Sequence, residues 1–409
     1  MTVLSHAPPD HGAEPSERPG ERPAAGHSDL PWDRARRLAA AASLPLPEAE
    51  VPLSDACGRR LAAPLRALVA LPGTDVSAMD GYAVGGPGPW LVVGNVLAGG
   101  APFPRRPGPG EAVEIATGAP VPAGTVCVVP YEQVEHAGLL ISGHCEPGRH
   151  IRRRGENVSE GTVVLTSGTT VTPAVLGLAA GLGHDTLWVR PRPVVSVLVT
   201  GDEVVDAGVP GPGLVRDAVG PMLPSLIASA DGRALPVRHL PDGAEVLETA
   251  IRESGADVVV VCGASSKGPA DHLRGVLGRL GAAVLVDGVA VRPGHPQALA
   301  RLPGGRLVVG LPGNPFAALA AALTLLVPVL RALNGRPEPE GELSALTGAV
   351  RGHPRDTRLV PVWRSARGAI PVGHDQPGSL RGAAMADALA VVPPGWAGEP
   401  VELLALPGQ

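Results

Sequence analysis

The sequence predicts a multidomain α/β protein. We expect a central α/β domain with a mainly parallel sheet, a β-rich inserted domain, a helical and extended linker domain, and a small C-terminal β domain. Three observations predict this fold class. A chain of 409 residues is too long for one hydrophobic core. Apolar strand-like runs alternate with helical segments over 191–333, a pattern typical of a parallel sheet covered by helices. Short apolar runs between Gly and Pro turns over 71–154, and again near the C-terminus, indicate two blocks of short strands.

The N-terminal third combines a tail, helices and short strands. Residues 1–28 are rich in Pro, Gly, His and charge and contain no apolar signal segment, which predicts a disordered tail. The segment "PWDRARRLAAAAS" predicts a helix, and "DACGRRLAAPLRALVA" over 55–70 predicts a second one. A strand followed by a Thr-Pro helix start is predicted over 161–183. The predicted domains are a tail (1–28), a discontinuous linker domain (29–70 and 155–190), a β-rich domain (71–154), an α/β domain (191–335) and a C-terminal β domain (336–409).

Composition and charge exclude several classes of protein. The net charge of −5 argues against a nucleic-acid partner, because such binding depends on contacts between basic residues and phosphates. The four cysteines have no metal-ligand spacing, which predicts reduced, buried thiols in a cytoplasmic protein. The longest apolar stretch, over 316–330, contains a proline and is shorter than a bilayer span. We therefore expect a cytoplasmic protein with neither a membrane nor a nucleic-acid partner.

Polar turns follow three of the predicted parallel strands. They are "TGDE" over 200–203, "CGASSKGPAD" over 262–271 and "LPGNP" over 311–315. Ligands of an open parallel sheet bind beyond the carboxyl ends of its strands, and helix N-termini suit phosphate groups. Carboxylates beside a phosphate imply either a bridging Mg²⁺ or proton transfer. Together, the three turns predict a phosphate-containing ligand at this edge.

Each turn also has an ordinary explanation. The adjacent acids Asp202 and Glu203 suit the first turn of a helix as well as a ligand site. The Gly/Ser stretch is, by itself, equally compatible with a plain loop. In "LPGNP", Asn314 suits a helix cap and Pro315 the first helical position. The functional interpretation depends on finding all three turns in order within one α/β block.

Six motifs in a fixed order resemble one family. They read "SAMDGYAV" (77–84), "IATGAPVPAG" (115–124), "IRRRGENVSEG" (151–161), "RPVVSVLVTGDEV" (192–204), "VRPGHP" (291–296) and "GLPGNP" (310–315). From about residue 31 to the C-terminus, the chain is similar to the MoeA or gephyrin E-domain family of molybdopterin molybdenumtransferases. The resemblance implies that the central α/β block is a molybdopterin-binding domain.

The resemblance also implies a reaction. Family members insert molybdate into the dithiolene of adenylylated molybdopterin and release AMP, with Mg²⁺ as cofactor and a homodimer as the working unit. The implied partners include a molybdopterin adenylyltransferase and acceptor molybdoenzymes. In this family the β-rich block of one subunit completes the cleft of the other.

The resemblance assigns roles to residues of this chain. The implied catalytic residues are Asp80, Thr117, Glu203 and Asp271, of which Glu203 and Asp271 would hold the metal. The implied substrate-binding residues are Thr200, Gly201, Asp202, Asp217, Gly263, Ser265, Ser266, Lys267, Gly268, Pro312, Gly313 and Asn314. The implied molybdate-binding residues are Arg292, His295, Arg358 and Ser379.

Several departures from the family pattern fall on the implied site. They are Ala264 for Gly and Pro269 for an acid in the Gly/Ser loop, Asn157 for Asp, Val219 for Asn, Arg292 and His295 for two lysines, and Ala317 for Ser. An imidazole loses its charge in a pH range where lysine stays protonated, so we expect weaker and more pH-dependent molybdate binding. Lys267 adds a cation that would compensate in part.

Three functions remain open on these grounds. We favour a working molybdenumtransferase with an altered anion site. The alternative is a catalytically impaired paralogue that binds molybdopterin or a nucleotide as a carrier or regulatory scaffold. A third hypothesis is that the α/β block alone adenylylates molybdopterin. The flanking blocks disfavour it, because they resemble those of family members that insert molybdate.

Overall fold

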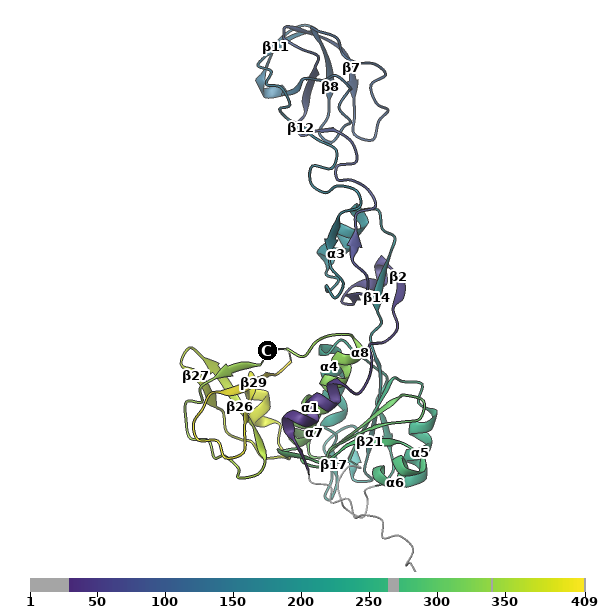
Figure 1. Ribbon diagram of the computed structural model, residues 1–409, viewed down its shortest axis with the longest axis vertical. Coiled ribbons are helices and arrows are strands. Elements are labelled where there is room, and N and C mark those ends of the chain that lie inside the picture. The colour runs from purple at the N-terminus through teal and green to yellow at the C-terminus, as the bar shows by residue number, and fades with distance from the viewer. Residues whose placement is uncertain (1–28, 264–271, 340, 408–409) are drawn as a thin grey trace, which may run out of the picture.

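The computed structural model describes residues 29–263, 272–339 and 341–407. Figure 1 shows an elongated molecule with a β-rich block at one end, a small connecting segment around α3 and β14, and two larger blocks at the other end. One of these larger blocks is the α/β block. The other is the C-terminal sheet, which lies beside it. This arrangement confirms the predicted multidomain α/β class.

The central sheet of the α/β block is mainly parallel. Strands β15 (Val194–Thr200), β20 (Val258–Cys262) and β24 (Leu307–Leu311) run parallel in its middle. Apart from Val194 at the start of β15, their Val and Leu side chains are buried on both faces, as expected of strands covered by helices. Beyond β24, two further strands extend the sheet in antiparallel pairing. At the opposite edge, two short strands pair in parallel with β15. These edge strands are β23 (Ala298–Arg301), β21 (Ala283–Asp287), β18 (Arg233–Ala234) and β19 (Arg238–Leu240).

Helices cover both faces of this sheet. One face packs against α4 (Val219–Ser229) and α7 (Pro315–Ala321), and the other against α5 (Ala244–Glu253) and α6 (Leu273–Arg279). Helix α5 was not predicted, although its buried residues Leu247, Ala250 and Ile251 have helical spacing.

The expectation that the longest apolar stretch is too short to cross a membrane was wrong. Helix α7 continues through a π-helical turn, η2 (Ala322–Leu326), into α8 (Val327–Leu333). The π-helical turn lies just before Pro328, which has no N–H to donate to the helix. The resulting 19-residue helix is long and apolar enough to cross a membrane, but 83% of its most apolar window is buried inside the protein. It is the core helix of the α/β block.

Helix α1 (Trp32–Ala40) forms as predicted and packs on this core helix. Its Trp32 donates an indole N–H to Thr324 Oγ1 at 3.1 Å. The preceding strand β1 (Leu30–Pro31) pairs with β22 (Val289–Arg292), so the start of the described chain lies against the α/β block and the C-terminal sheet.

The C-terminal sheet contains two strands from outside the C-terminal region. Strand β22 pairs in parallel with β26 (Thr357–Ser365), with Arg292 opposite Arg358. Two residues implied in molybdate binding, 66 positions apart, therefore lie side by side. The remaining elements of this block are β25 (Glu342–Ser344), β27 (Gly368–Pro371), α9 (Arg381–Met385), β28 (Ala388–Val392) and β29 (Val401–Ala405).

The helix predicted over 55–70 was wrong. The structure has the single turn α2 (Leu53–Ala56) and two short strands, β3 (Arg60–Leu61) and β4 (Leu65–Arg66). Gly58, at a φ of 74°, and Pro64 interrupt any helix there. The segment packs with α3 (Pro173–Gly181), which begins as predicted with Thr172 as its cap. These strands and β13 (Val163–Leu165), β2 (Ala49–Pro52) and β14 (Thr186–Arg190) form the connecting segment.

The β-rich block is a six-stranded sheet that carries the "SAMDGYAV" motif on β6 (Gly81–Val84). A Cβ at Gly81 would lie 2.1 Å from the carbonyl oxygen of Val129, so only glycine fits beside the neighbouring strand. The other strands are β7 (Trp90–Val96), β8 (Glu111–Ile115), β9 (Cys127–Pro130), β10 (Val134–Ala137) and β11 (Leu140–Gly143), and a separate pair is formed by β5 (Val76–Ser77) and β12 (Ile151–Arg152).

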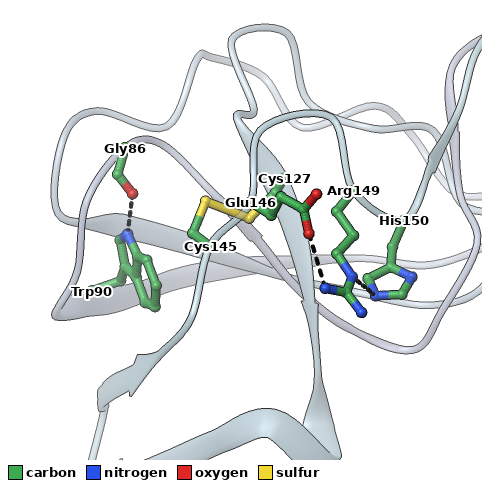
Figure 2. Close-up of a disulfide and its surroundings, with 7 residues drawn as sticks. All are labelled: Gly86, Trp90, Cys127, Cys145, Glu146, Arg149 and His150. Carbon is green, nitrogen blue, oxygen red and sulfur yellow. Dashed lines mark hydrogen bonds and ion pairs between the residues drawn. A yellow bond between two sulfur atoms is a disulfide. The ribbon is translucent and has the colours of Figure 1, made fainter.

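The prediction of four reduced, buried thiols was wrong. Cys127 and Cys145 form a disulfide, and Cys57 is exposed. Figure 2 shows the disulfide joining β9 to the segment that carries Glu146 and Arg149. Backbone hydrogen bonds, including Val128 N to Arg149 O at 3.1 Å, hold that segment beside β9 and bring the two Cα atoms to 6.1 Å. This long-range pairing has no signature in the cysteine spacing.

The disulfide gives a direct prediction. In protein purified without reductant and then denatured, a thiol reagent should detect two thiols, Cys57 and Cys262, and four after reduction. In the native protein Cys57 alone should react, because Cys262 is buried. Mass spectrometry after alkylation assigns the sites, and alkylation of all four cysteines without reductant would contradict the pairing.

Candidate active site

A cavity of about 620 Å³ lies beyond the carboxyl ends of β15, β20 and β24. Its walls include Thr200, Glu203, Asp217, Gly263 and Asn314, and we call it the strand-end cavity. Parallel strands bring all of their C-terminal turns to one edge of a sheet. Turns that are far apart in the sequence therefore meet here.

Glu203 and Asp202 have different surroundings. Both are exposed, but only Glu203 lines the strand-end cavity. Asp202 Oδ1 instead accepts the backbone N–H of Asp242 at 3.1 Å. The alternative that these acids begin a helix is wrong, because they form a turn that leads directly into the short strand β16 (Val204–Val205). Glu203 is thus the acid of this pair that faces the cavity.

Asp217 is buried in the cavity wall. Its Oδ1 accepts the backbone N–H groups of Val219 at 2.9 Å and Gly220 at 2.8 Å, at the start of α4. Its Oδ2 lies 2.8 Å from Nε2 of His239, a residue that the sequence analysis did not single out. These contacts engage both carboxylate oxygens, so Asp217 shapes the wall and orders the start of α4.

Gly263 and Thr200 bring two strand ends close together. Thr200 donates its hydroxyl to the carbonyl of Cys262 at 3.1 Å. Gly263 has a φ of 100°, and a Cβ there would lie 2.6 Å from the Thr200 carbonyl oxygen. Burial raises the pKa of the Cys262 thiol, and the neighbouring Asp217 acts in the same direction. Cys262 is therefore a neutral wall residue and not a nucleophile.

The Gly/Ser loop after Gly263 lies outside the described residues. The implied site residues that fall in this loop are Ser265, Ser266, Lys267, Gly268 and Asp271, together with the altered positions Ala264 and Pro269.

The alternative that the Asn314 side chain caps the following helix was wrong. Pro315 occupies the first position of α7 as expected, but the Asn314 side chain makes no capping hydrogen bond and lines the cavity instead. The first helical N–H groups, of Phe316 and Ala317, donate to the carbonyl of Pro377 at 2.9 and 3.3 Å. A backbone carbonyl from the C-terminal block therefore takes the place of a side-chain cap or a phosphate at this helix start.

A second cavity of about 640 Å³ adjoins the first. Three residues implied in molybdate binding, Arg292, His295 and Arg358, line it, and we call it the anion cavity. Ala317 also lines it, whereas Ser379 lines neither cavity. Both cavities have Pro296, Pro312 and Asn314 in their walls. The two cavities therefore share one wall.

Each of these three basic residues has an acidic partner. Arg292 Nε lies 2.6 Å from Asp356 Oδ2, and His295 Nε2 lies 2.9 Å from Asp29 Oδ2. Arg358 pairs with Asp375. These acids were not predicted from the sequence, although Asp356 stands directly before β26 and two positions before Arg358. The ion pairs orient the basic side chains, more firmly at Arg358, whose side chain is 25% exposed, than at Arg292, which is 62% exposed.

Two family models match most of the chain. One, described as the MoeA N-terminal region (domain I and II), matches residues 30–183, and the other, a probable molybdopterin binding domain, matches residues 196–332. A molybdopterin molybdenumtransferase 2 from Mycobacterium tuberculosis is 34% identical over 367 residues, which cover 84% of this chain and 90% of the relative. The chain belongs to the MoeA family of molybdopterin molybdenumtransferases.

Other MoeA-family proteins agree with this assignment. A molybdopterin molybdenumtransferase from Synechococcus elongatus is 34% identical over 313 residues, covering 72% of this chain and 78% of the relative. The crystal structure of a molybdopterin biosynthesis MoeA protein from Pyrococcus horikosii superposes with a TM-score of 0.79 at 26% identity, covering 93% of this chain and all of that one (100%). The similarity therefore extends over the whole multidomain arrangement of the MoeA fold.

Asp80 and Thr117 are the implied MoeA-family residues of the β-rich block. The backbone N–H of Thr117 donates to Asp80 Oδ1 at 2.6 Å, and both residues are exposed. In Figure 1 the β-rich block and the α/β block stand at opposite ends of the molecule, with the connecting segment between them. One chain therefore does not bring Asp80 and Thr117 to Glu203.

The described part of the chain contains one free carboxylate suited to Mg²⁺ at the strand-end cavity. Glu203 lines the cavity, whereas both oxygens of Asp217 are engaged. Over residues 29–263, 272–339 and 341–407, no group of three His, Cys, Asp or Glu side chains has metal-binding geometry. A lone carboxylate fits Mg²⁺, which is commonly held by one or two carboxylates together with substrate phosphates and water.

Proposed function

We propose that this MoeA-family protein inserts molybdate into adenylylated molybdopterin and releases AMP. The observation that carries the proposal is the pair of adjoining cavities. One lies at strand ends with a free carboxylate, and the other is lined by arginine and histidine. Two reactants held side by side react as if at very high local concentration. The common wall would let the dithiolene of the pterin meet the anion.

In this proposal the strand-end cavity binds the phosphate-containing part of the substrate. Thr200, Gly263 and Asn314 would contact it. The implied loop residues Ser265, Ser266, Lys267 and Gly268 would complete the contact. Glu203, with Asp271, would hold Mg²⁺, which supplies positive charge that offsets the charge of the pyrophosphate as its bond is cleaved. Without a cation, the Glu203 carboxylate would repel the phosphates.

The anion cavity would bind molybdate through Arg292, His295 and Arg358, with Ser379 nearby. Arginine offers a planar fork of N–H donors that suits an oxyanion. The ion pairs with Asp356 and Asp375 hold both guanidinium groups in position and leave other N–H groups for the ligand. Two fixed arginines therefore favour a functional anion site despite the loss of the two family lysines.

We further propose a homodimer in which each active site uses two subunits. The separation of Asp80 and Thr117 from Glu203 within one chain supports this arrangement. The β-rich block of one subunit would reach the strand-end cavity of its partner. The partners implied for the reaction sequence, a molybdopterin adenylyltransferase that supplies the substrate and molybdoenzymes that accept the product, also remain proposals.

The carrier or scaffold alternative is not favoured, because the curated relatives are named as transferases. Purified protein mixed with adenylylated molybdopterin, molybdate and Mg²⁺ tests the proposal. We expect AMP release that requires molybdate. A protein that binds the substrate but releases no AMP in any molybdate concentration would support the carrier reading instead.

A further inference from the structure

We propose that His353 is a further ligand of the oxyanion in the anion cavity, donating a hydrogen bond from Nε2. The inference rests on the proposed molybdate site and extends it to a residue outside the implied set. His353 lines the anion cavity together with Arg292, His295 and Arg358. It lies in the loop before β26, and its side chain is 25% exposed.

The loop itself determines which ring nitrogen carries the proton. Nδ1 of His353 accepts the backbone N–H of Asp356 at 2.9 Å and that of Arg355 at 3.3 Å. A nitrogen that accepts hydrogen bonds carries no proton, so the neutral ring is protonated at Nε2. The Asp356 carboxylate is also 3.3 Å from Nδ1. The shorter backbone contact favours the acceptor assignment for Nδ1, because the carboxylate is already engaged by Arg292.

The Nε2–H of His353 is a donor without a partner in the described chain. The other basic groups of the cavity are engaged, since Arg292 and Arg358 pair with acids and His295 Nε2 pairs with Asp29. Across the parts of the chain that the structure describes, no hydrogen bond involves Nε2 of His353. A fixed N–H donor on a residue that lines a cavity with two arginines suits the oxygen of a tetrahedral oxyanion.

Asp356 links this donor to the arginine. Its backbone N–H orients the His353 ring, and its carboxylate holds Arg292 Nε. The side chain of Asp356 is only 15% exposed, which strengthens both interactions. One residue thus positions two groups that face the same anion. His353 and Arg292 offer directed N–H donors. These donors replace part of the attraction for an anion that two lysine charges supply in the family pattern.

Two isosteric substitutions separate a ligand role from a structural one. In His353→Asn, the side-chain oxygen matches Nδ1 and keeps the contact with the loop, but the donor at Nε2 is lost. In His353→Gln, the amide nitrogen matches Nε2 and keeps the donor, but the contact at Nδ1 is lost. The ligand role predicts about tenfold weaker molybdate binding in His353→Asn and binding close to wild type in His353→Gln.

The binding of sodium molybdate to the full-length protein is measured by calorimetry, and the molybdate dependence of AMP release is measured separately. His144→Asn changes an exposed histidine of the β-rich block and serves as the matched control. We expect half-saturation by molybdate to rise in His353→Asn while half-saturation by adenylylated molybdopterin stays unchanged.

Two results would overturn the inference. One is unchanged molybdate binding in His353→Asn. The other is weakened binding in His353→Gln alone, which would indicate a purely structural role at Nδ1. If wild type bound molybdate and released no AMP, the proposed function would fail, and the calorimetric comparison would still decide the role of His353.

Discussion

Replacing Glu203 with glutamine should lower the rate of molybdate-dependent AMP release by about 100-fold or more, because loss of one preorganised charge at a reacting phosphate typically has this effect. Glutamine keeps the size of the side chain and removes its charge. Glu203 is exposed, and its carboxylate makes no hydrogen bond with the described residues, so the fold should be retained. Steady-state AMP release at saturating molybdate measures the effect.

The loss should depend on the metal and on the position of the charge. A higher Mg²⁺ concentration should recover part of the activity if Glu203 acts by holding the cation. Asp206→Asn removes an exposed acid three positions further on that does not line the cavity, and it should release AMP at the wild-type rate. Equal activity of Glu203→Gln and wild type would mean that the strand-end cavity is not the reaction site.

A mixture of Asp80→Asn and Glu203→Gln subunits should recover about a quarter of wild-type activity, although each variant alone is nearly inactive. Random exchange makes half of the dimers mixed. In each mixed dimer, one site combines an intact α/β block with an intact β-rich block from the other subunit. Asparagine at position 80 can still accept the Thr117 N–H, so the loop should keep its shape.

Subunit exchange is checked with two different affinity tags, and AMP release is measured on the doubly purified mixed dimers. Those dimers should have about half of wild-type activity, because one of their two sites is intact. If the mixed dimers were as inactive as their parents, Asp80 and Glu203 would not act in one shared site. A purely monomeric protein in sedimentation would also contradict the shared site.

The sequence predicted those helices and strands that carry a strong local signal, such as a helix cap or a continuous apolar run. Helix α3 carries a Thr cap and a first-position Pro, and β15 and β20 are continuous apolar runs. The segment 55–70 misled because its apolar residues have helical spacing, whereas Gly58 and Pro64 prevent a helix. The pairing of β22 with β26 could not be predicted, because it depends on contacts between segments far apart in the chain.

The candidate site shows the same division. The polar turns after β15 and β24 were predicted to lie at one edge of the sheet, and in the structure both turns line the strand-end cavity. The pairing of Arg292 with Asp356 and of His295 with Asp29 arises from long-range packing, for which the sequence has no local signal. The donor at His353 depends on a local turn, in which its ring accepts the N–H groups of residues 355 and 356. Likewise, the carbonyl of Pro377 replaces the expected cap at Asn314 because the C-terminal block folds over the start of α7.

The stoichiometry of a single turnover tests the central claim most directly. Excess protein is mixed with adenylylated molybdopterin, Mg²⁺ and molybdate, and both AMP and pterin-bound molybdenum are quantified from the same sample. The proposed function predicts one AMP released for each molybdenum bound, and almost no AMP when molybdate is omitted. AMP release that is equal with and without molybdate, or substrate binding without any AMP release, would contradict it.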